Sequence, residues 1–387
     1  MPLPLTINAT QMRLINRSAI LELIRRSSPI ARSDIGRQLG LSLPTVMRIV
    51  NDLLKEGIIY DTGASQWSNG RRRQLLAYNK QSSLVVGIDL GGTKIFGTLA
   101  NVGGDILTEQ YMEWLGGSAE DKFDTLVELV RQLLATPHPT GAKLRGIAIG
   151  APGLTYSQSG VVRWAPALNW RDFPLKAKLE KVFDLPVFVD NDVNLAVLGE
   201  QYFGAGQGLR NMILIAIGTG MGAGLIIDGK LYRGAHEASG EVGYLLPSIE
   251  ALGVNYEHFG AMESLVSGSG IAERARQLLS KSTLATPPLT AKKVFEAARR
   301  QEEWALHVIQ ETVNYLTMTI ANISTVLDPE LVILGGGVAN SADLLIPPIL
   351  ERLEGLIPCK PCIKASNLGY RAAVMGAIAL TVLSTTG

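Results

Sequence analysis

Residues 187–200 read V-F-V-D-N-D-V-N-L-A-V-L-G-E, and the rest of the chain can be interpreted outward from this stretch. An apolar run typical of a buried strand leads into Asp190, Asn191 and Asp192, and a run of helical character follows. This junction predicts two carboxylates and an amide at the carboxyl end of a strand, where open α/β sheets bind ligands. Such groups suit sugar hydroxyls, because they accept and donate hydrogen bonds. Alternatively, Asp190 and Asn191 only cap the helix.

Two other apolar runs end in glycine-rich turns, and their repetition suggests an internal duplication that faces one cleft. Residues 84–95 read L-V-V-G-I-D-L-G-G-T-K-I, and residues 212–229 read M-I-L-I-A-I-G-T-G-M-G-A-G-L-I-I-D-G. Glycine lets backbone N–H groups approach phosphate oxygens, while Thr and Lys add donors and Asp89 can hold Mg²⁺. Glycine-rich hairpins are also common in any sheet, so a purely structural turn stays open. With the triple-glycine turn in 330–339, the predicted nucleotide contacts are Asp89, Gly91, Gly92, Thr93, Lys94, Gly218, Thr219, Gly220 and Gly336.

Residues 18–57 predict three short helices near the start of the chain. The third helix starts at Ser42, a good N-cap, and its apolar residues have the spacing of one buried stripe. The opposite face carries Thr45, Arg48 and Asn51, which predicts contacts with a DNA major groove. Two strand-like runs joined by a polar loop follow, and this order of elements is that of a winged helix.

The loop of this predicted wing is basic. Its tip reads S-N-G-R-R-R, residues 68–73, and we expect Arg71, Arg72 and Arg73 to reach phosphates or a minor groove. Residues 1–80 hold twelve Lys and Arg against five Asp and Glu, a net charge of +7, whereas residues 81–387 carry −6. This asymmetry favours a polyanion as the partner of the first part only. A solvated charge run on a small helical bundle is the alternative.

The length of 387 residues is enough for two or three domains. We expect a cytoplasmic protein with no membrane partner, because no segment reads as a signal peptide and the longest apolar runs are too short or too rich in glycine to span a bilayer. The two cysteines, Cys359 and Cys362, form the sequence C-K-P-C. A zinc site needs two more ligands and a redox pair usually opens a helix, so we interpret this pair as structural.

Seven motifs, in order over nearly all of residues 81–380, together resemble the ROK family of bacterial repressors and sugar kinases. The winged helix is similar to that of the family's repressor branch. The motifs are D-L-G-G-T-K at 89–94, G-A-P-G at 150–153, N-W-R-D at 169–172, D-N-D-V-N at 190–194, G-T-G-M-G-A-G at 218–224, L-Y-R-G-A-H-E-A-S-G-E-V-G at 231–243 and I-L-G-G-G at 333–337.

The resemblance implies an α/β body with an actin-like sugar kinase fold of the RNase H-like type, behind the N-terminal winged helix-turn-helix. The expected domains are the winged helix at 1–80, a first lobe at 81–198 that also takes the C-terminal helix 371–387, and a second lobe at 199–370. Sugar is expected deep in the cleft between the lobes, and ATP across the glycine turns.

The resemblance also implies roles for individual residues in the cleft. Asp192 corresponds to the catalytic base of the kinases. Glu241 as a simple turn carboxylate, and Glu263 as an acid at a helix start, are the alternatives. The implied sugar contacts are Gly153, Asn191, Asp192, Glu241 and Glu263.

The chain departs from the family in one plain respect. Many members carry a His directly after the G-E-x-G turn and then a cysteine cluster, which together bind a structural zinc. Here the His position is Tyr244, and residues 245–262 contain no cysteine and only His258. A single imidazole does not make a zinc site, so we expect no structural metal. The wing also departs slightly, with Arg72 and Arg73 where the family usually shows Arg and Pro.

These features favour a sugar-responsive DNA-binding transcriptional regulator, acting as a repressor of carbohydrate metabolism. An ATP-dependent sugar kinase that carries a winged helix is the alternative, because D-L-G-G-T-K and Asp192 are retained. A scaffold that uses both parts only for interaction is the third. The expected partners are operator DNA and a small sugar, with no cofactor needed for DNA binding and with ATP and Mg²⁺ as candidate ligands. We expect a homodimer, or a dimer of dimers, on an inverted repeat.

Overall fold

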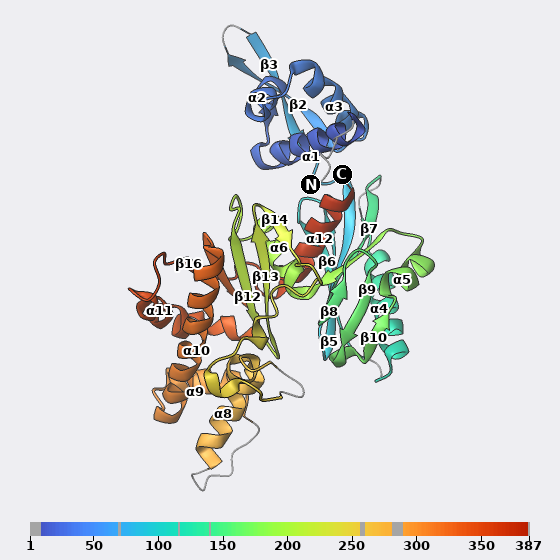
Figure 1. Cartoon of the computed structure of the whole chain (residues 1–387). Helices are drawn as coiled ribbons and strands as arrows, with labels where there is room; N and C mark the ends of the chain where they lie inside the picture. The colour runs from blue at the N-terminus through green and yellow to red at the C-terminus, as the bar shows by residue number, and fades with distance from the viewer. Residues whose placement is uncertain are drawn as a thin grey trace, which may run out of the picture.

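The computed structural model describes residues 9–68, 71–114, 117–138, 141–255, 260–280 and 289–385, with the backbone alone at 9–11, 66–68, 71, 72 and 280. A small N-terminal domain lies above two α/β lobes that stand side by side (Figure 1). Two helices run between the lobes, and the C-terminus lies next to the N-terminal domain. The domain boundaries expected from the sequence stay a prediction.

The N-terminal domain is a winged helix. Helix α3 buries four apolar residues on one face, as the spacing predicted, because these side chains recur on the same side of the helix. The strands form a three-stranded sheet in the order β1-β3-β2. The elements are α1 (Ala9–Ser27), β1 (Ile30–Ala31), α2 (Arg32–Leu39), α3 (Leu43–Lys55), β2 (Ile59–Ser68) and β3 (Arg71–Tyr78).

Three details of the winged helix differ from the sequence prediction. Helix α1 is longer than expected, because ion pairs from Arg13 to Asp52 and from Arg17 to Glu56 hold its largely exposed first half against α3. The short strand β1 adds a third strand that two residues could not reveal from their pattern. Ser42 is the N-cap of α3, but its hydroxyl lies 2.9 Å from that of Thr45 and makes no capping bond to the helix backbone.

Lobe 1 is built on a five-stranded sheet in the order β11-β7-β4-β5-β6. The strands β4, β7 and β11 are parallel, so their carboxyl ends meet at one edge of the sheet, with Gly150 of β7 in register with Asp89 on one side and Asp190 on the other. The elements of this lobe are β4 (Ser83–Leu90), β5 (Lys94–Asn101), β6 (Ile106–Glu113), α4 (Ala119–Leu134), β7 (Lys143–Ala151), β8 (Leu154–Tyr156), β9 (Val161–Ala165), η1 (Pro166–Leu168), β10 (Trp170–Phe173), α5 (Leu175–Phe183) and β11 (Val187–Asn191).

Lobe 2 repeats this topology with a sheet in the order β14-β13-β12-β15-β16. In each lobe an antiparallel hairpin carries a glycine-rich turn, and parallel strands follow on the other side of its first strand. The elements are β12 (Met212–Ile217), β13 (Met221–Ile227), β14 (Lys230–Tyr232), η2 (Val242–Tyr244), η3 (Ile249–Ala251), α7 (Glu263–Val266), α8 (Gly268–Ser280), α9 (Ala291–Arg299), α10 (Glu303–Leu327), β15 (Leu331–Gly335), η4 (Gly337–Ser341), α11 (Ala342–Leu353) and β16 (Cys362–Ala365). Both Cys359 and Cys362 are free and exposed.

Helices α6 (Asp192–Phe203) and α12 (Ala372–Thr385), the latter after the short η5 (Gly369–Arg371), pack against each other between the two sheets. Glycine makes this approach close: a side chain at Gly199 would collide with the carbonyl oxygen of Ala372, and one at Gly376 with that of Leu195. The expected boundary after residue 198 lies inside α6.

The winged helix is packed against the body rather than suspended from a linker. One hydrophobic cluster contains Ile20 and Ile24 of α1 together with Met375, Ile378 and Val382 of α12. The connection between β3 and β4 is only four residues long, from 79 to 82. The winged helix and the body therefore share one packed hydrophobic core. Over the part of the chain that the structure covers, no helix combines the length and the apolar character needed to cross a membrane.

Candidate functional site

The junction between β11 and α6 lies at the centre of the cleft between the lobes. Asn191 is the N-cap of α6, and its Oδ1 accepts from the backbone N–H groups of Val193 at 2.9 Å and Asn194 at 3.1 Å. Its Nδ2 donates to the carbonyl oxygen of Gly153 at 3.1 Å. Asn191 therefore does cap α6, as the alternative interpretation held. The same side chain also contacts Gly153, which is another of the implied sugar contacts.

Asp192 begins α6 and lies close enough to Asp89, at the end of β4, for the two carboxyls to repel each other. Burial, followed by the charges of Asp89 and Glu241, raises the pKa of Asp192 to about 7, against the hydrogen bond from the backbone N–H of Val193. Burial also raises the pKa of Asp89 to about 6, against the nearby charge of Lys94. A carboxyl with a pKa near neutrality can exchange a proton with a hydroxyl under ordinary conditions.

Glu241 and Glu263 contribute two more carboxyls from lobe 2. Glu241 precedes the 3₁₀ helix η2, and burial, followed by the charge of Glu263, raises its pKa. Glu263 begins α7, and its Oε2 accepts from the backbone N–H of Met221 at 2.7 Å. Its pKa is raised by burial, against this hydrogen bond. Asp89 and Asp192 from lobe 1 and α6 thus converge with Glu241 and Glu263 from lobe 2.

Four carboxyls with raised pKa values form an electrostatically costly cluster when the cleft is empty of partners. Hydroxyl groups relieve this cost by donating hydrogen bonds, and a cation relieves it by charge. A polyhydroxylated molecule has the chemistry to do so, because it offers several donors on one small frame. Among the described residues, no group of three or more His, Cys, Asp or Glu has a geometry that could hold a metal ion.

A small cavity of about 30 Å³ remains beside these carboxyls, where the two lobes meet. A left-handed backbone at Gly153 (φ 78°) shapes one wall, and any side chain there would collide with the carbonyl oxygen of Trp164. The cavity is far smaller than the few hundred Å³ of a typical ligand pocket, so a sugar needs the lobes to open. The lining residues are Gly153, Asn191, Val193, Asn194, Gly222, Ala223, Glu237, Ser239, Gly240 and Glu241.

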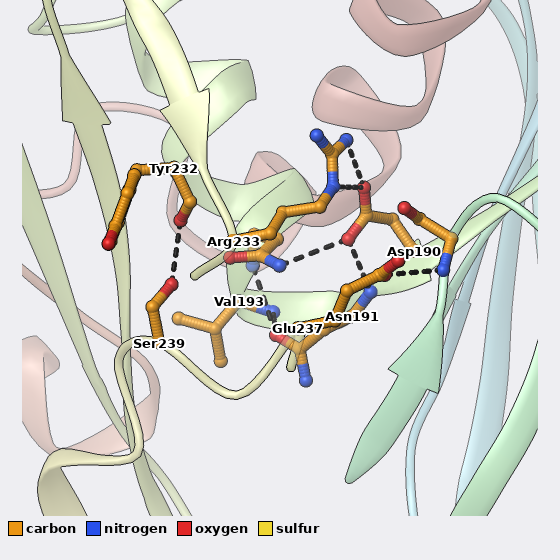
Figure 2. A network of polar contacts seen from close by, with 9 residues as sticks. Asp190, Asn191, Val193, Tyr232, Arg233, Glu237 and Ser239 are labelled. Atoms are coloured by element: carbon orange, nitrogen blue, oxygen red, sulfur yellow. Dashed lines mark hydrogen bonds and ion pairs between the residues drawn. The ribbon is translucent and has the colours of Figure 1, made fainter. Parts of the chain in front are cut away.

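Figure 2 shows a polar network that crosses between the lobes at this point. Asp190 is buried, with 1% of its side chain exposed, and its Oδ2 accepts from Arg233 of lobe 2 through Nε at 2.9 Å and Nη2 at 2.6 Å. Glu237 of lobe 2 accepts from the backbone N–H of Ser157 in lobe 1 at 2.5 Å. Sequence reasoning missed Arg233 and Glu237, although both lie inside the motif at 231–243.

The two glycine turns lie at the carboxyl ends of β4 and β12. In the first turn, Gly92, Thr93 and Lys94 are exposed, and the N–H of Gly91 donates to the carbonyl oxygen of Lys94 at 3.0 Å. A side chain at Gly91 would lie 2.8 Å from that oxygen, so this tight turn requires glycine.

The second turn is supported by lobe 2. The N–H of Gly218 donates to the carbonyl oxygen of Gly220 at 2.9 Å, and Ser269 of α8 donates to the carbonyl oxygen of Thr219 at 3.2 Å. Gly336 has φ 76°, and a side chain there would lie 2.5 Å from the carbonyl oxygen of Ile217. The triple-glycine turn therefore packs directly against the end of β12. Backbone groups and hydroxyls of both turns can hold phosphates, which fits the predicted nucleotide contacts.

Tyr244 stands where the family usually has a histidine. It is 66% exposed, and burial of its hydroxyl, followed by the charges of Glu241 and Glu263, raises its pKa. The phenol thus lies beside two of the cleft carboxyls. His258 lies outside the described residues, and the expected absence of zinc stays a prediction.

The DNA-binding face predicted for α3 is exposed at Arg48 and Asn51 and half-buried at Thr45. A hollow of about 570 Å³ separates α3 from the wing, and its walls include Arg32 and Met47. Sequence reasoning did not single out Arg32, which begins α2.

The three wing arginines are not equivalent. Arg73 is half-buried, and its Nη1 lies 3.2 Å from Oδ1 of Asp34 in α2, so it also ties the wing to the helices. The backbones of Arg71 and Arg72 pair with β2 opposite Ser68 and Trp67, while their side chains lie outside the described part of the structure.

Comparison with known proteins identifies both parts of the chain. The sequence profile of the ROK family matches residues 85–383, and that of a winged helix-turn-helix DNA-binding domain matches residues 13–60. The xylose repressor of Caldicellulosiruptor bescii is 30% identical to this chain over 391 residues, which cover 97% of each protein.

Two solved structures have the same architecture. A ROK family transcriptional regulator, a homologue of the E. coli MLC protein, superposes with a TM-score of 0.84 at 24% identity and covers 96% of each chain. A ROK family glucokinase from Streptomyces griseus, in complex with glucose and AMPPNP, superposes with a TM-score of 0.66 at 30% identity, over 77% of this chain and 99% of its own. The winged helix and the two-lobed actin-like body predicted from the sequence are thereby confirmed, and the chain belongs to the ROK family.

Proposed function

We propose that this protein is a sugar-responsive DNA-binding transcriptional regulator that acts as a repressor. One observation carries the proposal: α6 starts at the cleft with Asn191 and Asp192 and ends at Tyr202 and Phe203, beneath the winged helix. A single rigid element thus connects a ligand site to a DNA-binding domain. The xylose repressor of Caldicellulosiruptor bescii, which matches along its whole length, supports the same conclusion.

The DNA contacts follow from the exposed face of the winged helix. Thr45, Arg48 and Asn51 of α3 read base edges in the major groove, and Arg71, Arg72 and Arg73 of the wing contact phosphates or the minor groove. One recognition helix reads only a few base pairs. A homodimer on an inverted repeat, or a dimer of such dimers, therefore supplies the required specificity.

The effector is a small neutral sugar held in the cleft. Gly153, Asn191, Asp192, Glu241 and Glu263 contact its hydroxyls, which replace the repulsion among the carboxyls with hydrogen bonds. A pentose or hexose matches this demand, because several adjacent hydroxyls reach several carboxyls at once. DNA affinity then changes only as far as the sugar binds the two conformations of the protein differently.

Two measurements on the purified protein test the proposal together. Footprinting on DNA from upstream of its own gene should protect an inverted repeat. Thermal unfolding in the presence of D-xylose, D-glucose or N-acetyl-D-glucosamine should shift upward with at least one of them, because a ligand that binds only the folded state stabilises it by mass action. A protein that protects no specific sequence, and that none of a broad panel of sugars stabilises, would refute the proposal.

Sugar kinase activity is the second candidate, and the pKa of Asp192 near 7 favours it. A base with this pKa can take the proton of a sugar hydroxyl. Asp89 would hold Mg²⁺, and the turns around Thr93 and Thr219 would hold the phosphates of ATP, which supplies the transferred phosphoryl group. Tyr244 in place of His removes one orienting contact, and we therefore expect at most slow turnover.

The kinase candidate is tested by ATP turnover in the presence of each sugar that stabilises the fold, with Asp192→Asn for comparison. Sugar-dependent turnover of about 10 per second, a common enzyme value, that disappears in Asp192→Asn would make catalysis the main function. Turnover that is absent, or that ignores Asp192, would leave the cleft as a sensor.

A further inference from the structure

The contact between Arg233 and Asp190 joins the two lobes at the floor of the cleft. Arg233 directly follows β14 in lobe 2, and Asp190 is the penultimate residue of β11 in lobe 1. The guanidinium donates twice to Oδ2 of Asp190, at 2.9 and 2.6 Å, and 28% of the arginine side chain is exposed against 1% of the aspartate. Arg is suited to such a site, because its planar fork fixes the direction of the carboxylate as well as its charge.

The other oxygen of Asp190 orients the start of α6. Its Oδ1 accepts from the backbone N–H of Asn191 at 2.8 Å and from Nδ2 of Asn194 at 3.0 Å. Asp190 therefore contacts Arg233 through one oxygen and both asparagines through the other, so the position of Arg233 affects the positions of Asn191 and Asn194. Asn191 in turn caps α6 and holds Gly153, and Gly153, Asn191 and Asn194 all line the small cavity.

Asn194 supplies an independent indication that a ligand is expected here. It lines the cavity and only 5% of it is exposed, yet its Oδ1 has no hydrogen-bond partner in the described structure. Its Nδ2 is already committed to Asp190, so the amide cannot turn to satisfy the oxygen elsewhere. A buried acceptor without a partner is costly, and a hydroxyl donor from a ligand removes that cost.

The segment that follows Arg233 crosses the cleft a second time. Residues 233–241 are anchored to lobe 2 where Ser239 donates to the carbonyl oxygen of Tyr232 at 2.7 Å, and Glu237 reaches the backbone of Ser157 in lobe 1 (Figure 2). The same segment ends at Glu241, one of the cleft carboxyls. This segment therefore links one of the cleft carboxyls to the contacts that join the lobes.

We propose that Arg233 is a positioning residue of the sugar site. It reaches from lobe 2 to Asp190 and thereby orients Asn191 and Asn194, with Asn194 as a further hydroxyl contact. The inference deepens the proposed function and rests on it, since it concerns the same cleft. It predicts that removal of Arg233 weakens sugar binding without changing the affinity of the winged helix for DNA.

The test compares sugar affinity, operator affinity and thermal unfolding in a set of full-length variants. Calorimetric titration with D-xylose, D-glucose and N-acetyl-D-glucosamine gives the sugar Kd. In Arg233→Ala the Kd should rise by about 5- to 150-fold, the range of a typical coupling between sites, and in Arg233→Lys by less, because the charge remains while the fork is lost. The operator Kd without sugar should stay within about twofold. Arg210→Ala is the matched control, because Arg210 pairs with Asp228 at 3.2 Å on the exposed surface of lobe 2.

Arg233→Ala leaves a buried carboxylate without a partner and risks poor folding. The double variant Asp190→Asn with Arg233→Met removes both charges and keeps an acceptor for Asn191 and Asn194. It should unfold near the temperature of the natural protein and still bind sugar more weakly, whereas a purely structural role would lower the unfolding temperature and leave the sugar Kd unchanged.

The possible results separate the two proposals. A natural protein that binds a sugar, together with Arg233 variants that bind it equally well or lose sugar and operator affinity in parallel, overturns the role of Arg233 alone. A natural protein that binds no sugar overturns the proposed function and this inference with it.

Discussion

The folded structure strongly raises the pKa of Asp192. Burial and the neighbouring charges of Asp89 and Glu241 raise its pKa from 3.8 to about 7. Between these two values the folded chain keeps a proton that the unfolded chain has released. The folded state binds more protons there, so this group's contribution to the free energy of unfolding falls as the pH rises through the window from about 4 to 7.

Asp192→Asn should therefore stabilise the sugar-free protein, and more so at pH 8 than at pH 5. We expect a gain of about 1 to 3 kcal/mol at pH 8, smaller than the full shift implies because the carboxyl is partly exposed to solvent. Urea unfolding at both pH values measures the difference. Asp124→Asn, at an exposed site on α4, controls for the loss of one negative charge. Equal gains at the two pH values would show that Asp192 does not titrate in this window.

Individual cleft residues differ in how well the sequence predicts them. Asn191, Asp192 and Glu241 each lie in a short motif next to a strand or turn, and local pattern is enough to select them. Arg233 and Asp190 are 43 positions apart, and Glu237 and Ser157 are 80 apart. Such pairs form only when two lobes close, so no local pattern contains them.

At the scale of single elements, α6 runs from the cleft to the winged helix. Its last turn carries Tyr202, whose ring lies 4.3 Å from the guanidinium carbon of Arg25 in α1. Arg25 is itself held by a double hydrogen bond to Glu22. A cation over an aromatic ring contributes about 0.5 to 2 kcal/mol, and this contact joins α6 directly to the winged helix.

Tyr202→Ala should uncouple the two sites while leaving each intact. The ratio of operator Kd values with and without sugar should fall toward one, because the ring that α6 presses against Arg25 is gone. Tyr202→Phe keeps the ring and should retain most of the ratio. Fluorescence anisotropy with labelled operator measures it. A ratio in Tyr202→Ala equal to that of the natural protein would place the coupling in another element, such as α12.

Helix α3 and the wing should contribute to DNA binding in different ways. Arg48→Ala should cost about 1 to 3 kcal/mol and relax the base preference, because base contacts specify while phosphate contacts position. Arg71→Gln with Arg72→Gln should weaken binding to all sequences and flatten the dependence on salt by about one unit of slope per lost phosphate contact.

Arg73→Gln is the informative comparison within the wing, because Arg73 also pairs with Asp34. It should change the salt slope less than either neighbour does and should lower the unfolding temperature slightly. Titrations of operator DNA with each variant at several salt concentrations measure the salt slope. Full affinity at every salt concentration after neutralisation of all three arginines would contradict the assignment of the wing.

At the scale of the whole molecule, the order of domains was predictable and their attachment was not. Hydrophobic periodicity in α3 predicted a winged helix and strand-turn patterns around Asp89 and Gly218 predicted an α/β body, while the two lobes were implied by the resemblance to the ROK family. The first half of α1 gave no such signal, because its apolar side chains are exposed and ion pairs to α3 stabilise it instead of a buried stripe. The shared core between α1 and α12 likewise joins segments from opposite ends of the chain.

Because the winged helix and the body share a packed core, we predict that closure of the lobes also changes the position of the winged helix. The net charge of +7 in residues 1–80 attracts DNA, and the net charge of −6 in the remainder keeps the body away from it. We predict that a sugar changes DNA binding through the packed contact between these two parts.

The operator affinity of the natural protein and of Asp192→Ala, each titrated with the sugar that stabilises the fold, tests this account most directly. The natural protein should change its operator Kd by about 5- to 150-fold on saturation, the usual range of coupling between sites. Asp192→Ala should bind the operator as tightly as the natural sugar-free protein and show no response to sugar. A full response in Asp192→Ala would place the sensor outside the cleft and contradict the account.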